Sequence, residues 1–571
     1  VDTADYSAMR AHGFVVDNRV YPSDVIGGDW RGVRRAAGVA PGYRINRGGR
    51  EAALVFPDST DGYRDCGVDP YLGPPLNPAG DALMITCSPL APRPVWAAYR
   101  NARYRLFADR YSAYGQEWRL LDLTTGRSTL VVDAPSIPQS ETNFAWAPDG
   151  RSIMISTALL PLRGPDSAQR VTHRMAAEID LQSGRITVVA PDSLIVRGWD
   201  PRTGVVEFAR HSAWFNVNDR TPRIYFQKRH GRWGRVSAPR DAAIRVVLDQ
   251  GPNQPPRLVV SDSALRPIRT LLDPNPRLLA ERTFGRVELF HWATKGGKVY
   301  VGGLYYPPDY VPGRRYPLVL QTHGFDSTAF LPDGVFTTGA AAQPLASAGI
   351  VVLQGVDQVA GDKTGGWGTP EEGPMTQGII EAAIDSLDHR GLIDRNKVAM
   401  EGFSRTCFST LYFLTHSSYP IAAADVTDGV DFSYMQYLVY HGGSDDENMN
   451  SGRPWGETHA HWLERAPGFR LDRIKTPMRL TAIGPHTVLQ EWEPYAGLLA
   501  QGKPAELVYI PDGSHILVKP WERMTSQQGA VDWYRFWLQG YEDPDSSKAD
   551  QYARWRRMRA QRDSTTAQST Q

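Results

Sequence analysis

The sequence has few cysteines, no long apolar run and no excess of charge of either sign. Its 571 residues include only Cys66, Cys87 and Cys407, too few for a disulfide-built scaffold or a cysteine-rich zinc site. The absence of any run of about 18 uncharged apolar residues excludes a membrane-spanning helix. The 63 Lys and Arg residues balance 62 Asp and Glu residues, so no overall field would hold the chain on nucleic acid or an anionic membrane.

Cys66 and Cys87 are candidates for a single disulfide bridge, with two small buried thiols as an equally supported alternative. A bridge would slightly favour the periplasm over the cytoplasm, but the sequence leaves the compartment undecided. It also leaves the oligomeric state undecided. The chain begins at Val1 without a charged segment followed by an apolar one, so we expect a mature form or a fragment.

Residues 1–283 have the pattern of an all-β region, because short alternating runs are separated by turn residues and helical periodicity is nearly absent. Similar turn sequences recur between these runs, at Asp122–Gly126, Ala147–Gly150, Asp180–Gly184 and Asp200–Gly204. A repeated unit of roughly 40–60 residues predicts a β-propeller with about six blades in this stretch. A β-sandwich with chance turn repeats is the alternative.

From residue 284 to 545, short apolar strands alternate with helical patterns, which predicts an α/β domain with a parallel sheet. The expected helices cover 376–390 and 405–416. The expected strands lie at 316–322, 349–353, 397–400, 422–426, 478–483 and 506–510.

Ser404 is the candidate nucleophile, because Gly402-Phe-Ser404 follows an expected strand and precedes an apolar helix. This context predicts a nucleophile elbow, in which a sharp turn exposes the serine hydroxyl above the sheet. Thr406 replaces the second glycine of the usual G-x-S-x-G pattern and crowds the crossing of strand and helix.

His515 is the candidate base, because Ile510-Pro-Asp-Gly-Ser-His515 follows the last expected strand and a serine hydroxyl needs an adjacent base. We expect no metal: His459 and His461 are separated by one residue, but no third ligand is implied. No organic cofactor is expected either.

The acid that orients His515 is less clearly marked. Residues 484–495, after the strand at 478–483, contain no Asp, so a Glu must serve there. We prefer Glu493, at the start of the following helix, over Glu491. The alternative reading is that both are favourable charges at a helix N-terminus. Asp428, after the preceding strand, is the third candidate.

An oxyanion hole needs two preorganised donors. The backbone N–H of Arg405, directly after the nucleophile, is one by position. The other is expected from His323-Gly-Phe325, where Gly324 permits close approach, and we assign it to the N–H of Phe325. The side chain of His323 is a further candidate contributor.

Several segments resemble serine peptidase family S9, the prolyl oligopeptidase class. They include Phe144–Ile155, Tyr305–Tyr310, Arg315–Leu320, Ile393–Val398 and Ile474–Pro477. The sequence around Ser404, the Trp492-Glu493 pair and the ending from Tyr541 to Trp555 resemble the lasso peptide isopeptidases within that class.

This resemblance implies an N-terminal β-propeller followed by a C-terminal α/β-hydrolase domain. Propellers of this class usually carry seven or eight blades, so we expect one or more N-terminal blades to be missing. The implied substrate is a threaded lasso peptide, whose ring is closed by an isopeptide bond from the N-terminal amine to an Asp or Glu side chain. Ser404 would attack that bond, with His515 as base and Glu493 as acid. The cognate peptide is not readable from the sequence.

Two alternatives stay open at this point. One is an oligopeptidase or acylaminoacyl-peptidase-like enzyme that acts on linear peptides. The other is a non-catalytic propeller scaffold, which Thr406 and the missing Asp keep in consideration. Residues 546–571 form a third segment, expected to be a solvated basic helix that places Trp555 and Met558 among five arginines, followed by a disordered tail.

Overall fold

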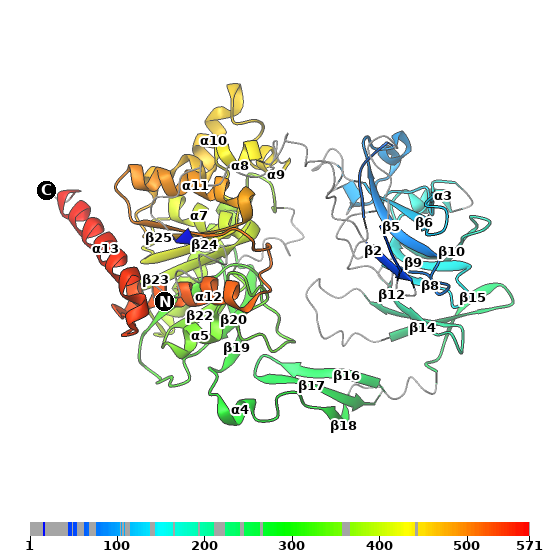
Figure 1. Cartoon of the computed structure of the whole chain (residues 1–571), viewed down its shortest axis with the longest axis horizontal. Coiled ribbons are helices and arrows are strands. Elements are labelled where there is room, and N and C mark those ends of the chain that lie inside the picture. Colours follow the sequence, from blue (N-terminus) through cyan, green and yellow to red (C-terminus); the bar gives the residue numbers. More distant parts are fainter. Residues whose placement is uncertain are drawn as a thin grey trace. The chain divides into compact units, whose positions relative to one another are not determined.

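The computed structural model describes residues 15–16, 44–47, 50–53, 62–67 and 76–569, with gaps at 103, 106–107, 109–114, 137–142, 164–165, 192–193, 211–222, 240–244, 263–265, 357–365 and 440–443 (Figure 1). The chain divides into two compact units. One comprises Val1–Arg34, Leu248–Arg257 and Leu272–Gln571, and the other comprises Arg35–Val247 and Leu258–Leu271.

The unit built around Arg35–Val247 consists of small antiparallel sheets. Three four-stranded sheets follow one another along the chain, and in each the strands that are consecutive in sequence are neighbours. They are β4 (Tyr63–Gly67), β5 (Ala82–Pro89), β6 (Glu117–Asp122) and β7 (Ser128–Leu130); β8 (Asn143–Trp146), β9 (Ser152–Ala158), β10 (Met175–Asp180) and β11 (Ile186–Pro191); and β12 (Leu194–Trp199), β13 (Val205–Arg210), β14 (Arg223–Arg229) and β15 (Arg232–Val236). A two-stranded sheet contains β2 (Arg44–Arg47) and β3 (Arg50–Ala53). A three-stranded sheet contains β16 (Arg245–Gly251), β17 (Gln254–Ser261) and β18 (Pro267–Leu272), and its residues are divided between the two units, because Leu248–Arg257 belongs to the other one.

The recurring turn sequences join strands of these sheets, as predicted. In the turn between β10 and β11, Gly184 donates its N–H to the carbonyl of Asp180 at 2.9 Å, and Gly126 and Gly204 close two further turns in the same way. Each of these three glycines has a φ near +69°, a conformation that side chains disfavour. The Asp180 carboxylate accepts the N–H of Ser183 at 2.7 Å, which lowers its pKa.

Successive sheets share hydrophobic cores. Trp118 of β6 packs edge-to-face against Phe144 of β8, with ring centroids 5.7 Å apart, in a cluster that joins the first and second four-stranded sheets. Met154 and Phe208 belong to a second cluster, which joins the second and third. Cys66 and Cys87, in register on β4 and β5, form a disulfide bridge. The described residues thus show repeated antiparallel sheets, and a closed propeller stays a prediction.

The other unit contains a nine-stranded mixed sheet. Its order is β1 (Val15–Val16), β26 (Ala505–Ile510), β25 (Met478–Ile483), β24 (Ala423–Thr427), β23 (Ile393–Phe403), β21 (Tyr316–Gln321), β22 (Val351–Gln354), β20 (Val299–Tyr305) and β19 (Val287–Ala293). The six strands from β26 to β22 are parallel to one another. The remaining pairs, β1 with β26, β20 with β22 and β19 with β20, are antiparallel. The six strands predicted from the sequence are these parallel ones.

Helices cover both faces of this sheet (Figure 1). Leu318 and Leu320 of β21 belong to a core with α6 (Glu372–His389), α7 (Cys407–His416) and α11 (Gly484–Ala500). Val319, between them, points to the other face and packs in a core with α5 (Ala342–Ser347) and α12 (Pro520–Tyr534). This alternation explains why the central strands are apolar throughout. Both predicted helices, at 376–390 and 405–416, are present.

The C-terminal segment differs from its prediction. Helix α13 (Ala549–Ser569) extends through most of the segment expected to be a disordered tail. Its side chains Tyr552, Trp555 and Met558 are buried in the same core as α12, so the helix is amphipathic rather than solvated on all sides. Residues 570–571 lie outside the described part of the chain.

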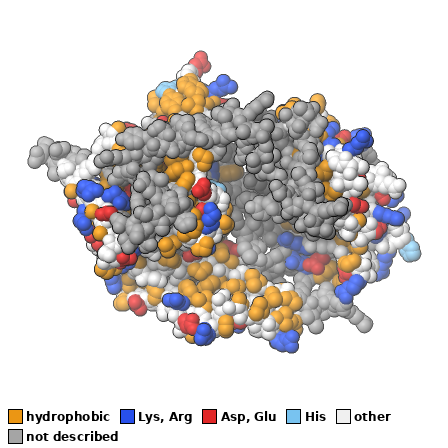
Figure 2. Space-filling view, in the orientation of Figure 1, with side chains coloured by type: hydrophobic (Ala, Val, Ile, Leu, Met, Phe, Trp, Pro, Cys, Tyr) orange, Lys and Arg blue, Asp and Glu red, His pale blue; other side chains and the backbone are white. Residues whose placement is uncertain are grey.

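Surface charges of both signs are interspersed over the visible described residues, in keeping with the balanced composition (Figure 2). Among the residues that the structure describes, no helix has the length and apolarity needed to cross a membrane.

Candidate active site

Ser404 occupies a sharp turn between β23 and α7. Its φ of +53° is unusual for a residue with a side chain. Gly402, one residue before the strand ends, lies close to the helix: a Cβ there would be 2.8 Å from the Cα of Cys407 and 2.9 Å from Oγ1 of Thr410. Close packing of strand and helix together with a strained serine is the geometry of a nucleophile elbow.

Thr406, which departs from the usual glycine pattern, is part of the turn. Its hydroxyl donates to the carbonyl of Phe403 at 2.8 Å and accepts a hydrogen bond from the Thr322 hydroxyl at 2.8 Å. The side chain therefore connects the elbow to the residue that follows β21. The crowding expected from a β-branched residue is offset by hydrogen bonds that a glycine would not make.

His515 lies in the segment between β26 and α12, as predicted, and its Nε2 is 2.8 Å from Oγ of Ser404. The imidazole stacks on the ring of Phe403, with centroids 4.8 Å apart. Thr338 fixes the backbone here, because its hydroxyl donates to the carbonyl of His515 at 3.0 Å and accepts the N–H of Leu517 at 2.9 Å. The His515 side chain is 50% exposed, so the site is open to an incoming molecule.

Asp428 is the carboxylate next to His515. Its Oδ2 lies 2.5 Å from Nδ1 of the imidazole, and its Oδ1 accepts the N–H of Ile483 at 3.2 Å. Asp428 directly follows β24, the neighbour of β23, and has a φ of +51°. Because its side chain is only 5% exposed, the carboxylate is shielded from water while it contacts the half-exposed imidazole.

The preference for Glu493 over Asp428 is corrected by this geometry. Helix α11 begins at Gly484 with no preceding loop, so Glu491 and Glu493 lie about two turns inside the helix instead of at its start. Glu493 accepts the N–H of Met435 at 2.6 Å, and Glu491 accepts the N–H of Gly429 at 3.1 Å. The structure brings Ser404, His515 and Asp428 together.

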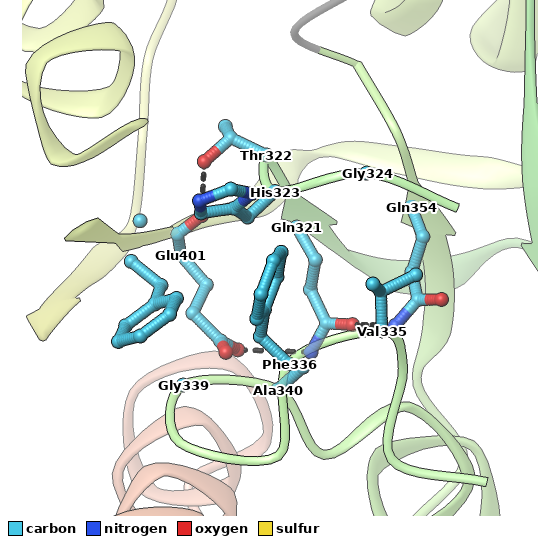
Figure 3. A pocket seen from close by; sticks show the side chains of 12 residues that line it. Gln321, Thr322, His323, Gly324, Val335, Phe336, Gly339, Ala340, Gln354 and Glu401 are labelled. Atoms are coloured by element: carbon cyan, nitrogen blue, oxygen red, sulfur yellow. Dashed lines mark hydrogen bonds between the residues drawn. The ribbon is translucent and has the colours of Figure 1, made fainter. Parts of the chain in front are cut away.

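A pocket beside the elbow contains His323 and Gly324 among its lining residues (Figure 3). Its inner wall carries a chain of hydrogen bonds, in which the Gln321 amide donates to Glu401 at 3.0 Å and the Gln354 amide donates to Gln321 at 2.6 Å. Burial raises the pKa of Glu401 well above its ordinary value, with the nearby Asp425 as the second cause. A neutral Glu401 is therefore the form that suits this wall.

The predicted oxyanion donors Arg405, Phe325 and His323 flank this region. Arg405 directly follows the nucleophile, while Phe325 turns its ring toward β20, where a Cβ on Gly303 would lie 2.1 Å from it. Burial lowers the pKa of His323 to about 4, with the charge of His515 as a second cause. His323 is thus neutral at physiological pH and able to act as a hydrogen-bond donor. The role of all three stays a prediction.

The side chain of Arg405 forms an ion pair with Glu372 of α6, at 2.8 Å. Its guanidinium also lies 5.1 Å from the ring centroid of Phe408 and 5.5 Å from that of Phe432. These contacts connect the residue after the nucleophile to α6 and α7. The sequence predicts a role only for the backbone N–H of Arg405 and gives no signal of this ion pair, because Glu372 lies 33 positions earlier in the chain.

No cluster of three or more His, Cys, Asp or Glu residues able to hold a metal ion occurs in the described ranges. His459 instead uses its Nδ1 for a contact of 2.9 Å with the carbonyl of Pro454.

In comparisons with known proteins, no protein-family model matches the chain. Over 346 residues, it is 29% identical to the lasso peptide isopeptidase AtxE2 of Asticcacaulis excentricus, a match covering 57% of this chain and 48% of that protein. It is 28% identical over 182 residues to a probable chloroplastic glutamyl endopeptidase of Arabidopsis thaliana, covering 30% of this chain and 17% of that protein. The matches therefore span half or less of these curated relatives.

Solved structures share the fold. A variant of AtxE2 with Astexin3-dC4 bound superposes with a TM-score of 0.54 and 20% identity, covering 91% of this chain and 83% of that one. A puromycin-hydrolyzing peptidase of Mycobacterium tuberculosis gives a TM-score of 0.53 and 17% identity, covering 87% and 72%. These comparisons confirm the resemblance to serine peptidase family S9 and support the predicted class of enzyme, a serine hydrolase.

Proposed function

We propose that this chain, whose sequence and fold resemble serine peptidase family S9, hydrolyses the isopeptide bond of a threaded lasso peptide. The observation that carries the proposal is the sequence of contacts from Ser404 Oγ to His515 Nε2 and from His515 Nδ1 to Asp428 Oδ2. The similarity to AtxE2, a lasso peptide isopeptidase, supports the choice of substrate.

Acylation begins when Ser404 Oγ attacks the side-chain carbonyl of the Asp or Glu that closes the ring. His515 Nε2 accepts the hydroxyl proton, while Asp428 accepts the Nδ1–H and so holds the tautomer that leaves Nε2 free to act as a base. The imidazolium that forms is stabilised by the shielded carboxylate. It then gives its proton to the leaving N-terminal amine as the C–N bond breaks.

The product of this step is an ester between Ser404 and the former ring carboxyl. A water molecule enters and loses a proton to His515 Nε2 as its oxygen attacks the ester carbonyl. Ser404 then leaves and recovers that proton. The net reaction consumes one water and yields a free carboxyl and a free amine, so the ring is opened and the peptide is linear.

Each tetrahedral intermediate carries a negative oxygen that needs donors. We assign the backbone N–H groups of Arg405 and Phe325 to this task, with the neutral His323 side chain as a further donor. Removing one such donor in other serine hydrolases lowers kcat by roughly 100- to 1,000-fold.

The proposed domain organisation follows the prediction: a β-propeller over residues 1–283, an α/β-hydrolase domain over 284–545 and a C-terminal helical segment over 546–571. Consecutive antiparallel sheets with shared cores support the propeller. Its blade number includes residues outside the described ranges.

The experiment compares the protein with its Ser404→Ala variant on a threaded lasso peptide and on the same peptide synthesised without threading or ring. Mass spectrometry should show one added water on the threaded peptide with the unsubstituted protein only. Cleavage of the linear peptide alone would contradict isopeptidase action. That result would favour an oligopeptidase, the alternative that the match to a glutamyl endopeptidase supports.

Labelling with a fluorophosphonate probe distinguishes an active serine hydrolase, whether isopeptidase or oligopeptidase, from a non-catalytic scaffold. Such a probe reacts with an activated serine whatever the natural substrate is. Labelling that disappears in Ser404→Ala would support a working site, and its complete absence in the unsubstituted protein would contradict the proposal.

A further inference from the structure

The segment that carries Asp428 is held by three consecutive backbone N–H groups. Asp428 donates to the carbonyl of Thr481 on β25 at 2.8 Å, and Val430 donates to the carbonyl of Ser404 at 3.2 Å. Between them, Gly429 donates to Oε1 of Glu491 at 3.1 Å. The first and third bonds use the main chain, so Glu491 is the side chain that completes the set.

The hydrogen bond from Gly429 to Glu491 matters because the backbone of Gly429 is tightly packed. A Cβ at this position would lie 1.9 Å from Sγ of Cys407 and 2.6 Å from the carbonyl oxygen of Ser404. The peptide after Asp428 therefore packs directly on the elbow. A small rotation of this peptide would move Asp428, whose φ of +51° already needs support from its surroundings.

We propose that Glu491 is a positioning residue for the reaction, which holds Gly429 and thereby keeps the Asp428 carboxylate against His515. The inference rests on the proposed function. Glu491 is 2% exposed on α11, so its side chain has a fixed place from which to act.

Glu491 performs this role as a neutral carboxylic acid. The groups that face it are acidic: Asp431, Asp428 and Asp425, together with the buried thiol of Cys407. Burial and the nearby Asp431 raise its pKa well above the ordinary value. A neutral acid accepts the Gly429 N–H through its carbonyl oxygen and adds no negative charge beside Asp428.

Two substitutions separate this role from that of an ionised catalytic acid. Glu491→Gln keeps the volume and a carbonyl acceptor, so kcat should stay within about threefold and the acidic limb of the kcat/KM pH profile should not move. Glu491→Met keeps the length and removes the acceptor, so kcat should fall by about 10- to 100-fold with little change in KM. Glu493→Met is the matched control, because Glu493 holds Met435 instead of the Asp428 segment, and its kcat should be nearly unchanged.

A loss in Glu491→Gln as large as that in Asp428→Asn would overturn the inference, as would full kcat in Glu491→Met. The rate of fluorophosphonate labelling provides a second readout that does not depend on the peptide chosen. If the unsubstituted protein is labelled but leaves the lasso peptide intact, the proposed substrate fails while the labelling rates of the variants still test Glu491. If Glu491→Met does not fold, Glu491→Gln decides through its labelling rate and pH profile.

Discussion

The Nδ1 atom of His515 lies 2.5 Å from Oδ2 of Asp428, a residue 87 positions earlier in the chain. The contact is formed by topology: β24 is the hydrogen-bonded neighbour of β23, so the residue after β24 lies beside the nucleophile that follows β23. Glu493 follows β25 in the sequence, and its carboxylate instead accepts the N–H of Met435 at the start of α8 (Tyr434–Val439).

This arrangement makes Asp428 the acid whose loss matters. Asp428→Asn keeps the shape but not the charge, and it favours the tautomer in which Nε2 carries the proton, so kcat should fall roughly 1,000- to 10,000-fold. Glu493→Gln should keep most of the activity. Steady-state kinetics on the threaded peptide, with circular dichroism to check folding, would measure both.

Equal losses in the two variants would show that Glu493 has a catalytic role that the structure does not reveal. A larger loss in Glu493→Gln than in Asp428→Asn would contradict the assignment of the acid.

Ser404 and His515 could be placed from the sequence because each follows an apolar strand within a few residues. A short connection leaves little freedom, so the strand end determines where the side chain lies. Asp428 has the same relation to β24 and carries the same kind of signal. From the sequence it is only the third candidate, because the Asp of this fold is expected after the next strand, where the chain has none.

The positions of Glu491 and Glu493 depend on where helix α11 begins, which the local sequence does not determine. Residues 484–495 include Gly484 and Pro485, which favour a loop before a helix, yet α11 starts at Gly484 itself. A proline in the first turn of a helix costs no hydrogen bond, so both readings satisfied local preferences. The contacts that decide between them come from residues far away in sequence.

A second prediction concerns Thr406. Thr406→Val keeps the branched shape but removes the hydroxyl that donates to the Phe403 carbonyl and accepts from Thr322, so the free energy of unfolding should fall by about 1–3 kcal/mol. Thr406→Ser keeps the hydroxyl and should lose less than about 1 kcal/mol. Denaturant unfolding followed by far-UV circular dichroism would measure the difference, and equal stability of the two variants would rule out a role for these hydrogen bonds.

A third prediction follows from the lowered pKa of His323, about 4 in the folded protein because of burial and the charge of His515. The unfolded chain, with an ordinary histidine pKa near 6.5, takes up the proton first as the pH falls. The stabilising contribution of neutral His323 is therefore complete above about pH 6.5, is lost progressively between about 6.5 and 4, and is constant below.

His323→Gln cannot take up this proton, so its stability should fall less steeply with acid in the same window. Between pH 6.5 and pH 4, the unsubstituted protein should lose roughly 3 kcal/mol more of its free energy of unfolding than His323→Gln, which is the energy that corresponds to the pKa shift. Denaturant unfolding at half-unit pH intervals would reveal it. Parallel curves for the two proteins would contradict a buried, neutral His323.

The last prediction tests the correction to the C-terminal segment. Trp555 is 1% exposed, packs edge-to-face on Trp533 with centroids 5.2 Å apart, and donates its indole N–H to Glu506 at 2.8 Å. Trp555→Ala should therefore lower the free energy of unfolding of this unit by about 3–5 kcal/mol, because it leaves a large cavity and removes the indole donor from the buried Glu506, which then keeps only its contacts with Arg554. Arg557→Ala, at an exposed position on the same helix, should change it by less than about 0.5 kcal/mol. Urea unfolding monitored by far-UV circular dichroism compares the two, and similar small losses in both would mean that the helix is solvated, as the sequence alone predicted.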